Sequence, residues 1–486
     1  MNMGKVAVFF TLPFCLPKGG IYMQQLTAKP VLLIFVAIYA VILVIVGAYY
    51  SRETKTSDEF VLAGKGLGSI VLIGTFLATY TGNGTISGGG NSLAYTYGLW
   101  PGIFFALPAI GGIIVLFLLS KKIRSSSSYT VAQLLENKYG RTARLLAGLI
   151  IALSMISICA YQYKGLAFIL NVTTGMDVNI ATAVAAVLII FLAFSGGLKS
   201  VAVTDAISAF IMLFGIIIAT PLVIRAAGGW SNVIASSSPE SLTLSGGQTF
   251  TGFISGYLPL FFLTMGDQNL YQRIAAGDGE KTVKKGFIGW FLGMLVVMPL
   301  VAFISFSAKV IFGDNIDPGM AFMSSTTVIP TLAGGILLAA AAAFIITTGD
   351  SYLLSGATNI TYDIYAEKIN PNATDAQKFK VTRWTIVIAG IAAYILLQFF
   401  PTVLAIQYWS YTIYGAGITP ALIGALCWKK VTKTGGIASM IVGTIVTIVY
   451  EMMKQPLGLA TVLVAVPVAV IVLIVVSFLT QEENQK

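Results

Sequence analysis

The segment TGNGTISGGGN, residues 81–91, decides how the fold of this sequence is interpreted. It lies inside an otherwise apolar stretch, residues 67–93. Each glycine costs a helix up to about 1 kcal/mol relative to alanine, and an unpaired backbone group in lipid costs several kcal/mol more. Interrupted helices at membrane depth occur mainly where they line a cavity. We therefore predict an interrupted helix here; the alternative is that the glycines only let helices pack closely.

The composition is that of a membrane protein. Of the 486 residues, 57% are hydrophobic and only 10% are charged, whereas a soluble domain carries about 25% charged residues. The apolar stretches are continuous rather than alternating, which disfavours a β-barrel. We predict an all-α polytopic membrane protein with about thirteen spans of roughly 20 apolar residues each. They are residues 29–50, 67–93, 99–120, 145–170, 179–196, 201–224, 251–268, 286–312, 331–358, 382–400, 402–427, 435–453 and 458–479.

The basic residues predict the orientation in a cell membrane. The net charge is +10, and Lys and Arg crowd four connecting segments, residues 121–144, 273–285, 368–383 and 429–433. Short loops rich in Lys and Arg stay in the cytoplasm. With thirteen spans and an external N-terminus, all four segments and the tail 481–486 lie inside. The positive charge thus indicates topology, and we expect membrane lipid but no nucleic acid as a partner.

Several kinds of chemistry are excluded by the residues that are missing. The chain has no histidine, which removes histidine proton relays, metal ligands and catalytic triads. Its cysteines, Cys15, Cys159 and Cys427, are scattered, so we infer neither a disulfide framework nor a zinc site. No nucleophile elbow or phosphate-binding loop is present. We predict that the protein is not an enzyme.

Residues 1–28 form a separate N-terminal segment with no predicted function. A lone Lys5 precedes a short apolar run, residues 6–16. This pattern is typical of a signal peptide, and the alternative is a gene start placed too early, with Met23 as the initiator.

A second apolar stretch, residues 251–268, is also interrupted, by Gly252, Gly256, Pro259 and Gly266. If the span at 29–50 is an extra leading helix, the two interrupted stretches are the first and the sixth of the rest. Interrupted helices at matching positions of two halves point to the binding site of a transporter. We predict five-helix units at 67–224 and 251–427, followed by two trailing helices within 435–480.

Four motifs resemble the sodium:solute symporter family, which includes proline, sugar, pantothenate and choline transporters. They are FSGGLKSVAVTDAISAF (194–210), GDQNLYQRIAAGDGEK (266–281), ITTGDSYLLSGATNITYDIY (346–365) and GITPALIGALCWKK (417–430). The motifs occur in the order of the family and cover most of the chain after residue 29. The resemblance implies a leucine-transporter-type fold of two inverted five-helix repeats with flanking helices.

The resemblance also implies a sodium site between the first and eighth core helices. Its ligands would be the backbone carbonyls of Asn83, Ile86 and Phe344 and the hydroxyls of Thr347 and Thr348. Oxygen ligands suit a hard cation, and an unwound segment exposes carbonyls. The alternative for the two threonines is that their hydroxyls bond back to the preceding turn.

Three ionisable residues lie within predicted spans, where a charge costs at least about 2.5 kcal/mol. In relatives the carboxylate matching Asp205 lies on the sodium exit route or binds a further sodium; the alternative is pairing with Lys199 or water. Asp350 either shapes the same site or is buried without a partner. Lys164 either holds a substrate carboxylate or extends to the outer interface.

We predict sodium-coupled import of a small organic solute, such as a carboxylate or an amino acid, by alternating access. The candidate solute contacts are Thr85, Ser87, Tyr161, Lys164, Thr264 and Thr412. A sugar is disfavoured, because apolar residues such as Leu260 replace the sugar contacts of relatives. Ser208 likewise replaces a glutamine that usually follows the fifth-helix motif. The alternatives are a proton-coupled symporter and a sensor or channel of the same fold; the oligomeric state is open.

Overall fold

The structure is a computed structural model that describes residues 28–53, 59, 62–126, 128, 130–195 and 197–481. All regular secondary structure of the described residues is helical, apart from an isolated bridge between Leu67 and Gly277. This agrees with the predicted all-α class. Residues 1–27 lie outside the described residues, so both interpretations of the N-terminal segment stay predictions.

The first half of the chain contains the leading helix and the helices up to α10. Its elements are α1 (Val31–Glu53), η1 (Ala63–Lys65), α3 (Ser69–Tyr80), η2 (Gly84–Gly88), α4 (Gly89–Tyr97), α5 (Leu99–Phe104), α6 (Ala106–Ser125), α7 (Val131–Tyr139), α8 (Arg141–Thr174), α9 (Val178–Ser195) and α10 (Leu198–Ala226). The glycine-rich segment 81–91 contains η2, a π-helical turn between α3 and α4.

The second half of the chain contains the remaining helices and ends in a helical hairpin. Its elements are α11 (Trp230–Ala235), η3 (Glu240–Leu242), α12 (Phe250–Gly266), α13 (Gln268–Ala276), α14 (Glu280–Phe312), η4 (Pro318–Met320), α15 (Ala321–Ser325), α16 (Thr331–Asn359), η5 (Ile360–Ile369), α17 (Asp375–Leu397), α18 (Val403–Gly417), α19 (Thr419–Cys427), α20 (Lys433–Met452) and α21 (Thr461–Leu479).

Nine helices of the described chain are long and apolar enough to cross a membrane. The four remaining predicted spans correspond to α1 and to three pairs of consecutive shorter helices, α3–α4, α12–α13 and α18–α19. The protein is thus a multi-pass membrane protein, while the total of thirteen spans stays a prediction.

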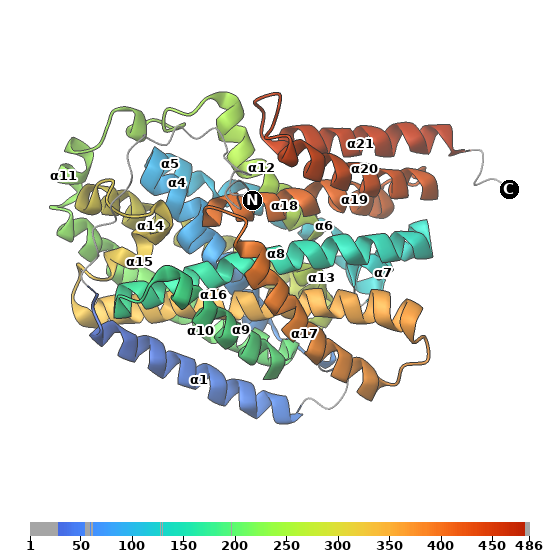
Figure 1. Ribbon diagram of the computed structural model, residues 1–486, viewed down its shortest axis with the longest axis horizontal. Coiled ribbons are helices and arrows are strands. Elements are labelled where there is room, and N and C mark those ends of the chain that lie inside the picture. The colour runs from blue at the N-terminus through green and yellow to red at the C-terminus, as the bar shows by residue number, and fades with distance from the viewer. Residues whose placement is uncertain are drawn as a thin grey trace, which may run out of the picture.

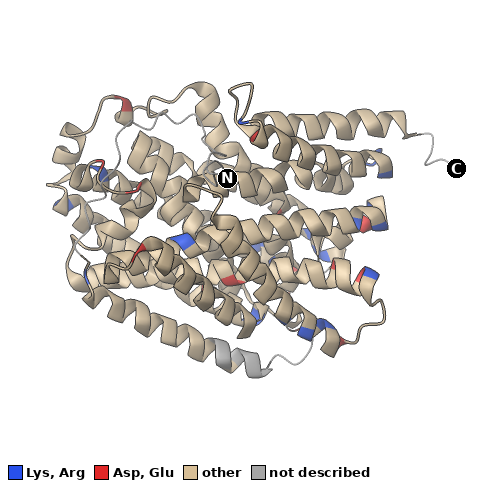
Figure 2. Cartoon of the chain, viewed as in Figure 1, with Lys and Arg blue, Asp and Glu red and all other residues tan. Residues whose placement is uncertain are grey.

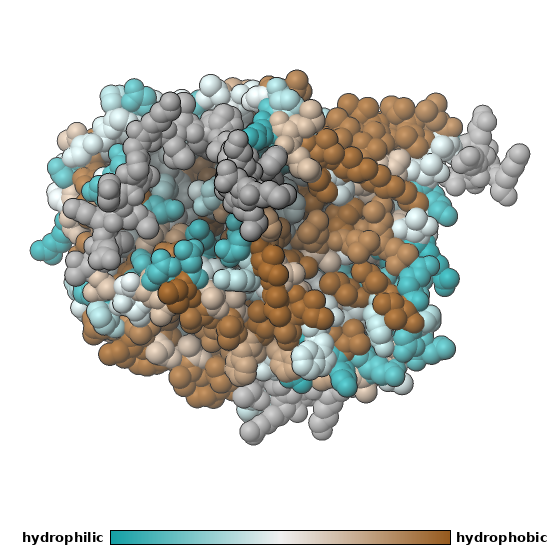
Figure 3. Space-filling model, viewed as in Figure 1, coloured by the Kyte–Doolittle hydropathy of each residue, from teal (hydrophilic) through white to brown (hydrophobic). Residues whose placement is uncertain are grey.

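The long helices lie side by side, and α8 and α16 run through the middle of the bundle (Figure 1). The middle of α16 fits the centre of the bundle because its side chains are apolar and small: residues 339–343 are all alanine and are at most 6% exposed. A helix that is apolar all round is normally buried or faces lipid. Apolar side chains cover much of the visible flanks, whereas hydrophilic ones gather mainly towards the two ends (Figure 3).

The four basic segments meet at one end of the molecule, where Figure 2 shows most of the Lys and Arg residues. The Lys122 ammonium donates to the carbonyl of Leu426 at 2.8 Å. The Arg124 guanidinium donates to the carbonyl of Gly277 at 2.6 Å, and Arg144 pairs with the buried Asp363 at 2.9 Å. This common end, called the basic end below, agrees with the predicted placement of all four segments on one side.

Helices α3 and α10 cross at very short range, and this crossing positions the candidate site. A methyl group on Gly74 of α3 would lie 2.3 Å from the Cα atom of Ala206 on α10. Backbone cannot move aside as a flexible side chain can, so only glycine fits. The neighbouring residues, Thr75 and Asp205, are thereby brought into hydrogen-bonding contact.

Gly74→Ala is expected to destabilise the protein by about 1–3 kcal/mol, because overpacking at a helix crossing forces backbone shifts. Gly68→Ala is the matched control, since nothing lies within 4 Å of a methyl group there. Thermal unfolding of both detergent-purified variants measures the difference. An equal melting temperature for the two variants would contradict the tight crossing.

Candidate functional site

The first helix interruption lies against α8 and α18, which supply its missing hydrogen bonds. The side-chain amide of Gln407 donates to the carbonyl of Gly84 at 3.0 Å, and its oxygen accepts from the amide of Gly89 at 3.1 Å. On the other side, the backbone amide of Asn83 donates to the side-chain oxygen of Gln162 at 3.1 Å. Buried backbone groups need such partners, so these two glutamines stabilise the interruption.

The second interruption lies at Asp267, one residue beyond the end of α12. The prediction placed it among Gly252, Gly256, Pro259 and Gly266, but α12 runs through those residues as one helix. The break thus lies within the predicted stretch 251–268, but the residues assigned to it were wrong, because an isolated proline or glycine is tolerated where neighbouring helices pack around it. The hydroxyl of Tyr414 donates to the carbonyl of Gly266 at 2.6 Å and accepts from the amide of Gln268 at 3.1 Å.

A carboxylate and two tyrosines join the two interruptions. Asp267 caps the N-terminus of α13 by accepting from the amide of Asn269 at 2.9 Å. Its second oxygen accepts from the hydroxyl of Tyr352 on α16 at 2.8 Å and from that of Tyr80, the last residue of α3, at 3.4 Å. The two interrupted helices thus face each other at mid-bundle, with α16 beside both.

The predicted sodium ligands lie around the contact between the first interruption and α16. A methyl group on Gly82 would come within 2.4 Å of the Thr348 hydroxyl, which also lies 3.3 Å from the carbonyl of Ala78. The hydroxyl of Thr347 is buried and has no hydrogen-bond partner among the described residues. Asn83, Ile86 and Phe344 are each fully buried. Their carbonyls as ligands stay a prediction.

Asp205 is completely buried and forms an ion pair with Arg273 of α13 at 3.1 Å. The hydroxyl of Thr75 donates to the same carboxylate oxygen at 2.5 Å and accepts from the Nε of Arg273 at 2.7 Å. Arg273 also donates to the hydroxyl of Ser351 on α16 at 2.8 Å. The pair therefore ties together α3, α10, α13 and α16. The alternative interpretation paired Asp205 with Lys199 or water; for this oxygen the structure shows Arg273 as the charged partner.

Arg273 itself corrects a sequence prediction. It was counted among the basic loop residues, yet it belongs to helix α13 and its side chain is fully buried between helices. The error follows from ending the sixth predicted span at residue 268, which left Arg273 outside the membrane. The signal that was available is a short amphipathic segment directly after Gly266, in which Asp267 and Arg273 are charged.

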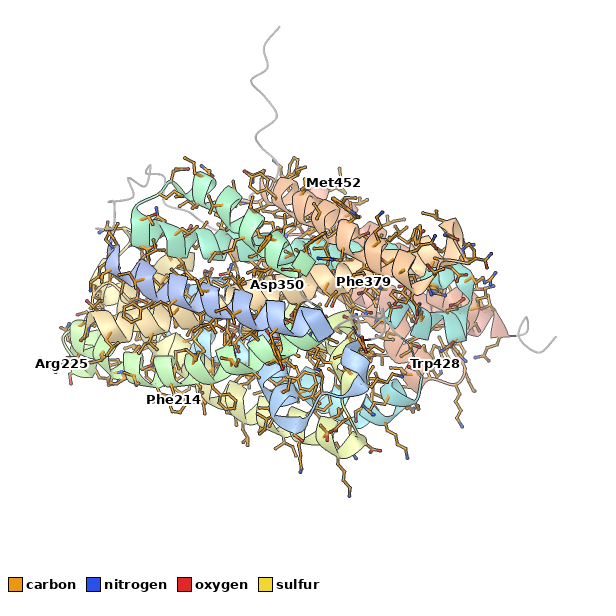
Figure 4. All side chains as sticks on the ribbon, turned by 90° about the horizontal axis from the view of Figure 1, so that it is seen from below. Phe214, Arg225, Asp350, Phe379, Trp428 and Met452 are labelled. Atoms are coloured by element: carbon orange, nitrogen blue, oxygen red, sulfur yellow. The ribbon has the colours of Figure 1, made fainter. Side chains whose placement is uncertain are left out.

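Unpaired carboxylate oxygens gather between α10 and α16. The Oδ1 atoms of Asp205 and Asp350 are buried and lack a hydrogen-bond partner among the described residues. The Thr347 hydroxyl lies close to Asp205 without forming a hydrogen bond in this geometry, and Asp350 lies within electrostatic range of Asp205. Figure 4 shows Asp350 in the middle of the bundle, between the labelled Arg225 and Trp428. Such oxygens are ligands for a hard cation.

The structure gathers three of the predicted solute contacts at the first interruption. The hydroxyl of Thr85 donates to the carbonyl of Tyr80 at 3.1 Å, and that of Ser87 lies 3.6 Å from the sulfur of Met323. The hydroxyls of Tyr161 and Tyr411 are 3.0 Å apart. Gln407 and Tyr411, which the sequence analysis missed, thus stand beside Tyr161; a glutamine inside an apolar span was the signal.

The other three predicted solute contacts lie apart from this group. Thr264 donates back to the carbonyl of Leu260 at 2.7 Å and packs against Gly112 of α6. Lys164 is half-buried close to Asp317, at the start of η4. Burial raises the pKa of Asp317, and the amide of Gly319 and the charge of Lys164 oppose this shift.

A cavity of about 480 Å³ lies at the end of the molecule opposite to the basic end, and Thr412 lines it. Tyr97 of α4, Pro259 of α12 and Tyr408 of α18 form part of its wall. The hydroxyl of Tyr408 is buried and has no hydrogen-bond partner among the described residues. The other residues that line the cavity include Asp317, Phe400, Trp409, Glu451, Lys454 and Thr461.

A model of the sodium:solute symporter family matches residues 60–443. The chain belongs to the sodium:solute symporter family. Its coupling ion is therefore sodium, and its family is one of transporters, which is not a class of enzymes. The family model covers both interrupted helices, the Asp205–Arg273 pair and α16.

Named relatives include the sodium/proline symporters of Staphylococcus aureus strains JH9 and NCTC 8325 / PS 47. Each is 26% identical over 511 aligned residues, which cover 96% of this chain and 96% of the relative. Among solved structures, a Na+-coupled sialic acid symporter in a substrate-bound outward-open state has a TM-score of 0.78 at 19% identity, covering 92% of this chain and 98% of its own. Mhp1, a nucleobase-cation-symport-1 family transporter, has a TM-score of 0.58 at 11% identity, covering 86% and 94%. These likenesses show a shared fold.

Arg273→Ala is expected to lower the stability by about 3–5 kcal/mol, because it leaves the buried Asp205 carboxylate without its cation. The double variant Asp205→Asn with Arg273→Gln removes both charges and should lose less. Chemical or thermal unfolding of the purified variants measures both. The exposed pair Glu280–Lys284 supplies a control, since Glu280→Gln should leave the melting temperature unchanged. Equal losses for Arg273→Ala and Glu280→Gln would contradict the role of the buried pair.

Proposed function

We propose that this protein imports a small organic solute together with sodium by alternating access. The observation that carries the proposal is the contact between the first helix interruption and α16. There the Thr348 hydroxyl lies against Gly82, and the Thr347 hydroxyl is buried without a partner among the described residues. Interrupted helices that meet at mid-bundle are the usual site of solute and ion binding in such transporters.

The ion would lie between α3 and α16. In the proposal, the carbonyls of Asn83, Ile86 and Phe344 and the hydroxyls of Thr347 and Thr348 hold one sodium. Burying an oxygen without a hydrogen bond costs free energy, and a bound cation would offset this cost at Thr347. The unpaired Oδ1 atoms of Asp205 and Asp350 would serve a second sodium or its exit route, since Asp350 follows Thr347 by about one turn of α16 and lies within electrostatic range of Asp205.

The proposed cycle starts from an arrangement that is closed at the basic end. There α13 is attached to α10 and α16: Arg273 pairs with Asp205, and the side chain of Gln272 accepts from the hydroxyl of Ser355 at 2.6 Å. The cavity lined by Thr412 lies at the other end. Inward release requires α3 and α13 to separate from α10 and α16. The sodium gradient and the membrane potential, about 2.3 kcal/mol per charge per 100 mV, drive the cycle.

The proposed orientation places the basic end in the cytoplasm and the N-terminus outside. The meeting of all four basic segments at one end supports this topology. We also propose that residues 67–224 and 251–427 are inverted five-helix repeats. Both units begin with an interrupted helix, α3–α4 and α12–α13, and residues of α16 and α18 stabilise both interruptions.

The proposed solute is a small carboxylate, an amino acid or a related metabolite. The names of the S. aureus relatives make proline the first solute to test. Thr85, Ser87 and Tyr161 would contact it at the first interruption, with Thr412 on the approach through the outer cavity and Thr264 on α12, where it packs against α6. Leu260 is apolar and 4% exposed, which supports the argument against a sugar.

Sodium is expected to raise the melting temperature of the purified protein, relative to choline or potassium at equal ionic strength, because a ligand of the native state stabilises it. Thr347→Val should raise the half-saturating sodium concentration about tenfold through loss of an ion ligand. Thr358→Val is the matched control, since that hydroxyl only bonds back to the carbonyl of Leu354 on the same helix. Uptake of labelled proline into proteoliposomes should vanish without sodium. An unchanged sodium titration in Thr347→Val would contradict the site.

Lys164→Ala is expected to reduce the preference for a solute that carries a carboxylate. Competition of labelled proline uptake by proline and by prolinamide measures this preference. Asp317→Asn separates two roles: if Lys164 binds the solute, losing its neighbouring carboxylate should strengthen the preference. If Lys164 only anchors η4 through Asp317, both variants should weaken transport alike, and an unchanged profile in Lys164→Ala would remove it from the solute site.

A further inference from the structure

Helix α1 buries one narrow face, and among the side chains of α1 that the structure describes this face contains a single polar one. Leu32, Val36, Tyr39 and Leu43 recur at helical spacing and are at most 7% exposed. Residues on the other side, such as Ile38 at 57% exposure, face outward to lipid. Tyr39 is therefore the one residue of this buried face that brings a hydroxyl group into the bundle. A buried tyrosine hydroxyl needs a hydrogen-bond partner.

The partner of the Tyr39 hydroxyl is the hydroxyl of Ser208 on α10. Ser208 donates its own proton to the carbonyl of Thr204 at 2.6 Å. It therefore accepts from Tyr39, which fixes the direction of the bond. The replacement of a glutamine by Ser208 left this position without an assigned hydrogen bond in the sequence analysis. In the structure, the hydrogen bond to Ser208 comes from α1, a helix outside the two proposed five-helix units.

This hydrogen bond lies one helical turn from Asp205, on the helix that faces the proposed ion path. The Tyr39 hydroxyl is close enough to interact electrostatically with the Asp205 carboxylate. The bond back to Thr204 and the bond from Tyr39 act on the turn that begins at Asp205. A serine that bonds back in this way often bends its helix, so the partner hydroxyl influences where the Asp205 side chain points.

Helix α1 is well placed to hold this turn still. At its outer end the Lys29 ammonium donates to the carbonyls of Thr327 and Ile329, at 3.2 and 3.4 Å. Further along, Phe35 packs against Gly335 of α16. The helix is thus attached to the segment before α16, to α16 itself and, through Tyr39, to α10. Both helices that carry the unpaired oxygens, α10 and α16, contact α1.

We propose that the Tyr39 hydroxyl is a positioning group for sodium binding: it holds the Asp205 turn of α10 against α16 through Ser208. The inference rests on the proposed function, in which Asp205 lies beside the ion path. Tyr39 does not touch the ion. Its removal alters the geometry of the Asp205 carboxylate relative to the oxygens of Thr347 and Asp350, and hence the affinity for sodium.

The test is a sodium titration of the melting temperature, with the full chain purified in detergent and ionic strength held constant with choline chloride. Tyr39→Phe and Ser208→Ala should each raise the half-saturating sodium concentration about three- to tenfold, the effect of one buried hydrogen bond. The double variant should show no further increase, because both changes remove the same bond. Ser208→Thr keeps a hydroxyl and should restore a near-native titration.

Thr220→Val is the control on the same helix, since that hydroxyl only donates to the carbonyl of Ile216. It should leave the sodium titration unchanged. If Tyr39→Phe lowers the melting temperature equally in sodium and in choline, with the half-saturating concentration unaltered, Tyr39 has a packing role only and the inference fails. Additive effects in the double variant would overturn it as well. Absence of any sodium stabilisation in the parent chain would instead overturn the proposed function.

Discussion

The structure depends on how the backbone groups freed at its two helix interruptions are paired. In lipid these groups have no water to bond to, so side chains must replace the missing helical hydrogen bonds. Helix α18 does this for both interruptions, through Gln407 at the first and Tyr414 at the second. These residues are seven apart, about two helical turns, and so lie on one face of the helix. A single face of α18 therefore pairs the free backbone groups of both interruptions and keeps the two interrupted helices next to each other.

The buried pair of Asp205 and Arg273 follows from the same arrangement. Because α12 ends at Gly266, the short helix α13 takes a new direction and brings Arg273 to α10 and α16. A charge at this depth is stable only when it is paired and hydrogen-bonded. Arg273 meets that condition with bonds to Asp205, Thr75 and Ser351. The Asp205 carboxylate thus takes part both in the contact that closes the basic end, through Arg273, and in the proposed ion path, through its unpaired oxygen.

Composition and the glycine-rich segment were enough to predict the all-α membrane fold and the first interruption. Four motifs were enough to predict the family. What the sequence did not predict is the partner of each buried polar group, because a partner comes from a distant helix. Gln407 lies 323 residues from Gly84, and Arg273 lies 68 from Asp205. The second interruption was misplaced for a related reason: Pro259 suggests a break, yet tertiary packing preserves α12 around it.

The contact between α13 and α16 is polar, and this favours reversible opening. Tyr352, Ser351 and Ser355 of α16 bond to Asp267, Arg273 and Gln272 of α13. Only the bond between Ser355 and Gln272 joins two neutral groups and contributes about 0.5–1.5 kcal/mol net, whereas the bonds to Asp267 and Arg273 contribute about 1.5–3 kcal/mol each. All these groups can pair with water instead once the contact opens. An apolar contact of the same size offers no such replacement and costs about 25 cal/mol per Å² to expose. A polar contact between α13 and α16 therefore suits the opening at the basic end that the proposed cycle requires.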